Sequence, residues 1–457
     1  MSIKVFAFLI YNMHNFMALA GAAMLIPILK PINFVEKAIQ TALSHVFSKP
    51  QMKNFIWLLS AAILGQKFNL SHIEGLLLGQ KSDNAFSWFL SHAKISPDQI
   101  WEAILKFAVS AFNTIGRAGY FIIDDTIEKH SKFCRFIQGV CSLYDHATGA
   151  YVKGKCFVFL YFAINDKIRF PIGWKVYVPD QKTKYTLALE LIDEALLKGF
   201  VCSYVLVDSW FAIAPFLDAL NRKKIRYVCE LKSNNKIWAT VDRRPLKFGL
   251  KKFFLYCAFA TKKTVFGLKT EGNNKEIKAK YKTSSATCQL CALDHQTVLV
   301  ESWMEGAKDP KYLITNDLRL ESQAVLEIYS WRWLIEEFFG DEKKLLDFEG
   351  ARVRNYQAGA ITVLTLSCAD LLLSLEIFKL SQKNSQSRAL TVSSMIAKTQ
   401  EENIQVLLEA LGSAEDGDCI ATKWLEVLKK GSSRFRRQRK ALYKLSEEDA
   451  LENCMAG

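Results

Sequence analysis

The chain has 457 residues, about three times the ~150 residues of a typical domain, which excludes a single small module. Half of the residues are hydrophobic and 23% are charged, so a wholly disordered chain is excluded as well. An excess of 60 Lys and Arg over 46 Asp and Glu gives a formal net charge of +14, which favours an anionic partner, either nucleic acid or a membrane surface.

Residues 1–30 form an apolar extension or helix that several interpretations fit. From Val5 to Leu29 there is no Asp, Glu, Lys or Arg, which is long enough for a membrane span. Polar groups that are costly in a bilayer interrupt it at Asn12, His14 and Asn15. A secretory signal and a translation start at Met24 are further interpretations. We expect a buried helix or an extension, no later membrane span, and no membrane partner.

Residues 31–115 are predicted to form a helical domain. Apolar residues recur at spacings of three and four in short stretches from about residue 33 to residue 112. Ser71 and Ser82 each precede such a stretch and are expected as N-caps. Helix-turn-helix DNA binding and a plain scaffold are equally compatible with this bundle of short helices.

From Gly119 the apolar period changes to two, which predicts strands. An apolar strand runs straight into Asp124, Asp125 and Thr126. It is followed by three β-rich runs at 139–144, 156–163 and 168–178 and by a helical stretch at 186–197. A second apolar strand at 205–207 then ends on Asp208. This order predicts a mixed α/β sheet with a catalytic edge at the strand ends.

Asp125 and Asp208 are the candidate functional carboxylates of this sheet. A carboxylate beside a buried sheet is costly unless it is paired or bound to a cation. The alternative is that the segment from Asp124 to Thr126 only caps a turn. Two such aspartates in one sheet of a basic chain favour a functional pair.

The stretch from about 226 to 316 returns to β character and contains a close pair of cysteines. Cys288 and Cys291 have the spacing of half a zinc site, and His295 is a candidate third ligand. No second half is present, and the 11 cysteines are odd in number and scattered, so two ordinary strand cysteines are the preferred interpretation. Reduced thiols fit the cytoplasm, which is the expected location.

Helical spacing resumes from Leu320 to about Leu346. One face of this helix carries four polar residues at offsets of 0, 3, 7 and 14, which lie within about 60° of one another around the helix axis. They are Tyr329, Arg332, Glu336 and Lys343. Glu337 points about 100° away from Glu336. Because aromatic and aliphatic residues crowd the same turns, we expect the polar stripe to face a groove, with a solvated face of intrahelical ion pairs as the alternative.

Together these motifs resemble the DDE transposases of bacterial insertion sequences, in the subgroup with a Tyr-x2-Arg-x3-Glu-x6-Lys signature. Asp125-Thr126 and Asp208 match the two aspartate motifs, and the four-residue signature fits at every position with its own spacing. The strings 227–232 and 311–315 also look like that subgroup. The resemblance extends over roughly residues 55–373.

The resemblance implies a ribonuclease-H-like catalytic domain at 116–380, with residues 226–316 as a β-rich insertion. Asp125, Asp208 and Glu336 would be its catalytic and metal-binding carboxylates. Asp124 is a rival, but Asp125 is preferred because the family's first Asp directly precedes the Thr. Two Mg²⁺ ions, with Mn²⁺ as a substitute, would activate the attacking oxygen and stabilise the leaving one.

The implied activity is cleavage of phosphodiester bonds at transposon ends and their joining to double-stranded target DNA, by a homodimer in a synaptic complex. The implied DNA contacts are Tyr329, Arg332, Lys343, Lys232, Arg436 and Arg437. The last two belong to a basic helical segment, residues 381–457, that begins with a polar linker. Trp238 and Trp303 are candidates for the tryptophan that holds a flipped base in some relatives, but they match no motif.

Three other functions stay open from the sequence. A catalytically degenerate, transposase-derived DNA-binding protein would keep the fold without the chemistry. A ribonuclease-H-like nuclease would cut without strand transfer. A membrane-anchored binding protein rests on the first 29 residues alone.

Overall fold

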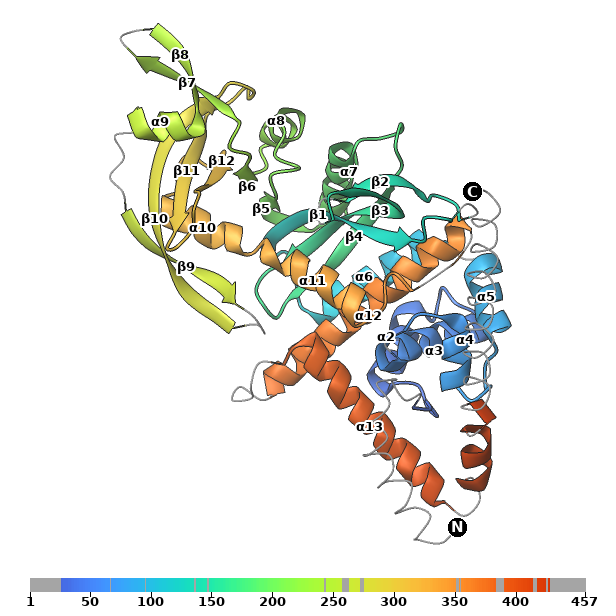
Figure 1. Ribbon diagram of the computed structural model, residues 1–457. Coiled ribbons are helices and arrows are strands. Elements are labelled where there is room, and N and C mark those ends of the chain that lie inside the picture. The colour runs from blue at the N-terminus through green and yellow to red at the C-terminus, as the bar shows by residue number, and fades with distance from the viewer. Residues whose placement is uncertain are drawn as a thin grey trace, which may run out of the picture.

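The computed structural model describes residues 26–427 except 66, 95, 135–136, 146–147, 242–243, 257–262, 272–274, 351–352, 354, 384–389, 414–416 and 425 (Figure 1). Most of the apolar segment, Met24, and the basic run with Arg436 and Arg437 lie outside the described residues. The predictions for these segments stay predictions.

Short helices fill the part of the chain before the sheet, as predicted. They are α2 (Asn33–Leu43), α3 (Lys49–Gly65), α4 (Leu70–Leu76), α5 (Asp83–His92) and α6 (Pro97–Ala111). The Ser82 cap is confirmed, because its side chain accepts a hydrogen bond from the N–H of Ala85. The Ser71 cap was wrong: α4 begins earlier, and Asn69 accepts from the N–H of His72 instead.

The middle of the chain forms a mixed sheet covered by helices. Its strands are β1 (Ala118–His130), β2 (Cys141–Asp145), β3 (Ala150–Ala163), β4 (Arg169–Tyr177), β5 (Val201–Val207) and β6 (Tyr227–Leu231). The strand order is β2-β3-β1-β5-β6. β2 pairs with residues 150–154 of β3, and β4 pairs with residues 156–163 of the same strand. β3 runs antiparallel to β1 and β4, whereas β1, β5 and β6 are parallel to one another. The helices α7 (Lys184–Leu197) and α8 (Ala214–Arg222) connect the parallel strands.

β1 is longer than predicted, and this changes the position of its aspartates. Pairing between β1 and β3 continues to His130, opposite Lys153. The backbone beyond the aspartates is therefore satisfied by strand pairing, and Asp124 and Asp125 lie inside the strand rather than at its end. Asp208 directly follows the last residue of β5, as predicted.

The β-rich stretch after β6 extends the same sheet. The helix α9 (Leu250–Tyr256) lies among its strands, which are β7 (Lys236–Val241), β8 (Arg244–Gly249), β9 (Lys263–Glu271), β10 (Lys275–Leu290), β11 (Thr297–Met304) and β12 (Lys311–Thr315). β12 pairs antiparallel with β6, and the order continues β12-β11-β10-β7-β8. The predicted mixed α/β class is confirmed, and the described residues place twelve strands in one sheet.

The helix predicted from Leu320 to Leu346 is two helices, α10 (Ser322–Ser330) and α11 (Trp333–Lys344). Between them, the N–H of Arg332 donates to the carbonyl of Tyr329 and that of Leu334 to Trp331, three residues back instead of four. Trp331 and Arg332 keep right-handed helical dihedrals. The chain therefore winds in the same direction across the join, and the polar side chains of both helices stay on neighbouring turns.

The helices α12 (Tyr356–Lys383) and α13 (Val392–Gly412) follow. Among the described residues, α12 alone is long and apolar enough to cross a membrane, which the sequence analysis did not anticipate. Its most apolar window is 83% buried inside the protein. It contacts α3, α5 and α6 on one side and β4 and α11 on another, between the N-terminal helices and the sheet (Figure 1). This burial is that of a core helix.

Buried acidic groups lie where α11 meets α12. Both carboxylate oxygens of Glu342 and one of Asp370 are buried without a hydrogen-bond partner among the described residues. Burial, followed by the charge of Asp341, raises the pKa of Asp370 to about 7, while Arg169 acts in the opposite direction. Burial also raises the pKa of Glu342. These two side chains therefore favour their neutral acid forms in the folded protein.

We expect the folded protein to lose stability as the pH rises from about 4 to about 7. The unfolded Asp370 ionises near its ordinary pKa of 3.8 and the folded one only near 7, so rising pH favours the unfolded chain until both are ionised. Urea unfolding at about pH 5 and about pH 8 should show a loss on the order of a few kcal/mol in the wild type. The loss should be smaller in Asp370→Asn but unchanged in Asp309→Asn, an exposed control. Equal losses in all three proteins would contradict this assignment.

Candidate active site

Three neighbouring parallel strands place an acidic residue at the same level of the sheet. Ile123 in β1 pairs with Val207 in β5, and Val207 pairs with Cys229 in β6. Each of these three residues is followed by an acidic one, and these are Asp124, Asp208 and Glu230 in turn. The carboxyl ends of β5 and β6 thus meet the middle of β1 at one acidic edge.

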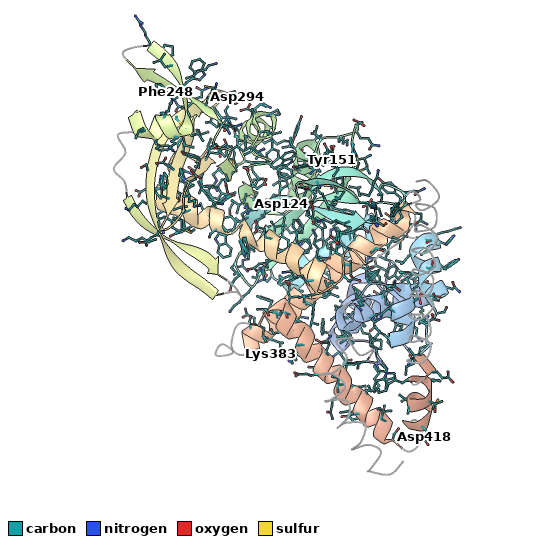
Figure 2. All side chains as sticks on the ribbon, viewed as in Figure 1. Asp124, Tyr151, Phe248, Asp294, Lys383 and Asp418 are labelled. Atoms are coloured by element: carbon teal, nitrogen blue, oxygen red, sulfur yellow. The ribbon has the colours of Figure 1, made fainter. Side chains whose placement is uncertain are left out.

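Arg332 joins this edge to the helix pair α10–α11. Its Nη1 lies 3.5 Å from Asp124 Oδ2, and its Nη2 forms an ion pair with Glu336 Oε1. The guanidinium also lies 5.7 Å from the ring centroid of Tyr329, whose hydroxyl donates to Glu230 Oε2 at 3.3 Å. One arginine therefore holds Asp124 of the sheet against Glu336 of α11. Asp124 lies where the sheet and the helices meet (Figure 2).

Asp208 is held by the backbone of the loop that it begins. Its Oδ1 accepts hydrogen bonds from the N–H groups of Trp210 (3.0 Å) and Phe211 (3.2 Å). Burial raises the pKa of Asp208, while these N–H groups and Arg332 act in the opposite direction. The turn thus fixes the direction of one oxygen and leaves the other for a ligand.

The carboxylates repel one another, and a cation would relieve this repulsion. Burial, followed by the charges of Asp208 and Asp125, raises the pKa of Asp124 to about 8, although Arg332 acts in the opposite direction. The donors at the edge are carboxylate oxygens, which hard divalent cations prefer. Asp124, Asp208 and Glu336 thus supply the donor type that such a cation prefers, although their oxygens do not form a group with metal-ligand spacing in this structure.

Asp125 points to the other face of β1. Neighbouring residues on a strand alternate between faces. Asp124 lies opposite Phe159, whose ring is 5.4 Å from that of Phe338 in α11. Asp125 Oδ2 instead accepts from Lys184 Nζ at the start of α7 (2.8 Å) and from the Cys156 thiol (3.3 Å). The structure thus groups Asp124, and not Asp125, with Arg332 and Glu336.

The other residues of the predicted stripe separate into two groups. Tyr329, Arg332 and Glu336 contact one another or a shared partner, as described above. Glu337 points elsewhere, as predicted, and pairs with Arg169 of β4. Lys343 lies farther along α11, where burial lowers its pKa. The charge of Lys129 acts in the same direction, whereas those of Glu349, Asp145 and Asp125 oppose it.

Two features of the site were not found from the sequence. Glu230 lies in the string 227–232, but no spacing marked its carboxylate as a neighbour of Tyr329. The exposed Trp210 was not singled out either, although Lys232 Nζ lies 4.9 Å from its ring centroid. Because neighbouring side chains on a strand point to opposite faces, the sequence could have shown that Asp124 and Asp125 do not share a face of β1. The neighbours across strands depend on register, which one sequence does not give.

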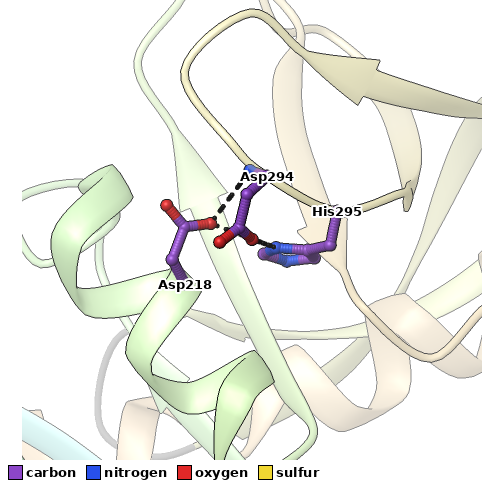
Figure 3. A group of neighbouring side chains, drawn as sticks. All are labelled: Asp218, Asp294 and His295. Carbon is purple, nitrogen blue, oxygen red and sulfur yellow. Dashed lines mark hydrogen bonds and ion pairs between the residues drawn. The ribbon is translucent and has the colours of Figure 1, made fainter.

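A second polar cluster involves the predicted zinc candidate His295. Its Nδ1 lies 3.1 Å from Asp218 and 3.0 Å from Asp294 (Figure 3). Its Nε2 is 2.8 Å from the hydroxyl of Tyr227. Among the described residues, these two aspartates and His295 are the one group with metal-ligand spacing, and neither Cys288 nor Cys291 belongs to it. Tyr227 begins β6, so the cluster lies at the opposite end of that strand from Glu230. Its hydrogen bonds tie the turn after β10 to α8.

The comparison with protein families agrees with this chemistry. Residues 77–247 match the family described as DDE superfamily endonuclease, a stretch that contains Asp124, Asp125 and Asp208 and ends before Glu336. No curated protein matches the sequence. Among solved structures, the fold is similar to one described as "Cryo-EM structure of piggyBac transposase synaptic complex with hairpin DNA". The TM-score is 0.45 at 9% identity, over 87% of this chain and 81% of that chain. The family match supports a DDE-type nuclease or transposase, a class that uses divalent metal ions.

Proposed function

We propose that the protein is a DNA transposase that cuts phosphodiester bonds at the ends of its own element and joins them to target DNA. The observation that carries the proposal is the position of Arg332, which contacts Asp124 and Glu336 beside Asp208. Three carboxylates from separate elements, converging on one edge of a sheet in a basic chain, suit metal-assisted chemistry on a phosphate.

The proposed catalytic carboxylates are Asp124, Asp208 and Glu336. The sequence analysis preferred Asp125 because Thr126 follows it. We now prefer Asp124 because its side chain shares a face with α11, whereas Asp125 is paired with Lys184. Asp125 then acts on the opposite face of β1, where it positions the lysine.

We propose that five strands form a ribonuclease-H-like core. The order β4-β3-β1-β5-β6 has three antiparallel neighbours followed by two parallel ones, and supports this assignment. Residues 226–316 then extend this sheet as a β-rich insertion between the second and third carboxylates. The N-terminal helices 31–115 and the segment 381–457 are proposed DNA-contacting parts on either side.

The chain's own residues have separate tasks in the proposed reaction. Asp124, Asp208 and Glu336 would hold two Mg²⁺ ions, or Mn²⁺ in their place, which supply activation of the attacking oxygen and stabilisation of the leaving one. Arg332 keeps its charge beside these acids and would donate two parallel hydrogen bonds to two oxygens of a phosphate. The ring of Tyr329 packs against the Arg332 guanidinium and orients it, and the Tyr329 hydroxyl donates a hydrogen bond to Glu230. The turn after Asp208 holds that carboxylate in place before DNA binds.

The partners of the proposed enzyme are double-stranded element ends and target DNA, bound by a homodimer in the cytoplasm. Strand transfer distinguishes a transposase from a nuclease. Purified protein is incubated with Mg²⁺, DNA that carries the flanks of its gene, and a target plasmid. We expect joined products with the wild type and none with Asp208→Asn. Cut ends without joined products would favour a nuclease, and DNA binding without cutting would favour the degenerate DNA-binding protein.

A further inference from the structure

The proposed reaction leaves one acid of the catalytic edge without a task. Glu230 lies beside Asp208, because the residues before them, Cys229 and Val207, are paired across β6 and β5. Its side chain is 25% exposed, so water screens its charge only in part. An additional acid so close to the others adds to their repulsion unless a cation compensates it.

The compensating cation comes from the β-rich stretch after β6. Lys311, the first residue of β12, places its Nζ 3.0 Å from Glu230 Oε2. β12 runs antiparallel to β6, and the register of the pair sets Tyr312 opposite Leu231. The ion pair therefore joins β12 to β6 at the level of the acidic edge.

The same oxygen of Glu230 accepts a second donor. The hydroxyl of Tyr329 in α10 donates to Glu230 Oε2 at 3.3 Å, and the Tyr329 ring centroid lies 5.7 Å from the guanidinium carbon of Arg332. A hydroxyl bound at one end of the ring fixes how the ring is turned, and the ring face attracts the guanidinium cation. Glu230 thus begins a series of contacts that ends on Arg332.

These contacts lead from the surface to the interior of the protein. The side chain of Lys311 is 68% exposed, and that of Arg332 is 14% exposed. At the inner end, Arg332 joins Asp124 to Glu336. The position of an exposed lysine on β12 is therefore linked to the position of the arginine between two of the proposed catalytic carboxylates.

We propose that Glu230 is a positioning residue for Arg332, and that β12 takes part in the active site because its Lys311 holds Glu230 in place. The inference rests on the proposed function, which assigns the Arg332 guanidinium to a phosphate of DNA. Glu230 acts through Tyr329 and touches neither DNA nor metal ions. Its carboxylate is already neutralised by Lys311, so it is poorly suited to be a further metal ligand.

The test is a double-mutant cycle between Glu230 and Tyr329, measured in two assays on the full chain. The first is the Mg²⁺-dependent nicking rate at saturating DNA that carries the gene's flanks. The second is the binding of the same DNA in chelator, measured by mobility shift. We expect Glu230→Ala and Tyr329→Phe each to lower the nicking rate by about tenfold and to weaken binding by a smaller factor. The double variant should lose no more than either single one, whereas two independent residues would multiply their losses.

Conservative and matched variants separate positioning from other roles. Glu230→Gln keeps an oxygen that accepts from Tyr329 and should retain most of the nicking rate, whereas a metal ligand would lose as much in this variant as in Glu230→Ala. Lys311→Met should lower nicking by a smaller factor than Glu230→Ala. Glu305→Ala and Lys308→Met remove the same charges from exposed positions before β12 and should nick like the wild type.

The inference is overturned if the losses of Glu230→Ala and Tyr329→Phe multiply in the double variant, if Glu230→Gln loses as much as Glu230→Ala, or if Glu230→Ala nicks and binds like the wild type. Loss of a negative charge alone would strengthen DNA binding, so weaker binding in Glu230→Ala identifies an effect on position.

The two assays keep this inference apart from the proposed function. Nicking by the wild type with multiplied losses in the cycle would remove the positioning role alone. DNA binding by the wild type without any nicking would remove the transposase, and the cycle is then decided by binding. A wild type that binds no DNA would overturn both.

Discussion

Replacement of Asp124 by asparagine is expected to abolish strand cleavage, whereas Asp125→Asn is expected to retain most of it. Asp124 contacts Arg332 on the face of β1 that Glu336 shares, and in the proposed site its replacement removes a metal-binding carboxylate. Asp125 contacts Lys184 on the opposite face. Even residues behind a metal ligand contribute ten- to hundredfold, so loss of a direct ligand should reduce the rate by at least about a hundredfold.

The two aspartates are adjacent in sequence and differ only in direction, so each variant is the control of the other. Both are measured by Mg²⁺-dependent nicking of DNA that carries the gene's flanks, after thermal unfolding shows that both are folded. Cleavage that survives in Asp124→Asn and disappears in Asp125→Asn would restore the assignment based on Thr126 and contradict the assignment based on the strand face.

Glu336→Gln is the second change with a large expected effect. It removes the third carboxylate and its ion pair with Arg332, so cleavage should fall by at least about a hundredfold. Binding to the DNA ends should change little, because a neutral glutamine adds no repulsion toward phosphates. Cleavage and mobility-shift binding are measured on the same protein preparation.

Glu337→Gln is the matched control for Glu336. Glu337 pairs with Arg169 of β4, and both side chains are mostly buried. Breaking that pair should lower the melting temperature while leaving the cleavage rate per folded molecule near that of the wild type. A Glu337→Gln protein that is folded but inactive, beside an active Glu336→Gln, would show that the wrong face of α11 had been assigned to the site.

Much of the architecture could be predicted because the periodicity of apolar residues is local information. The period-two pattern from Gly119 and the helical spacing at 186–197 correspond to β1 and α7 within a few residues. The ends were less predictable. β1 continues past its two aspartates because β3 satisfies its backbone to His130, and this partner lies far along the chain.

The site was predictable in its residue types and less so in its geometry. The spacing of Tyr329, Arg332 and Glu336 correctly placed them together, because the chain keeps winding through the short break before α11. To choose between Asp124 and Asp125, one has to know which face of β1 lies against α11. The neighbourhood of Glu230 and Trp210 required the register of β1, β5 and β6, which is set by packing between distant segments.

The central claim is that the acidic edge cuts DNA with divalent metal ions. Its most direct measurement is nicking of DNA that carries the gene's flanks by the wild-type chain, with Mg²⁺ and with chelator, beside Asp208→Asn. We expect cutting at the element ends with Mg²⁺ only, and none in Asp208→Asn, because the turn after β5 presents that carboxylate to the site. Cutting that persists in chelator or in Asp208→Asn, or tight end binding without any cutting by the wild type, would contradict the claim.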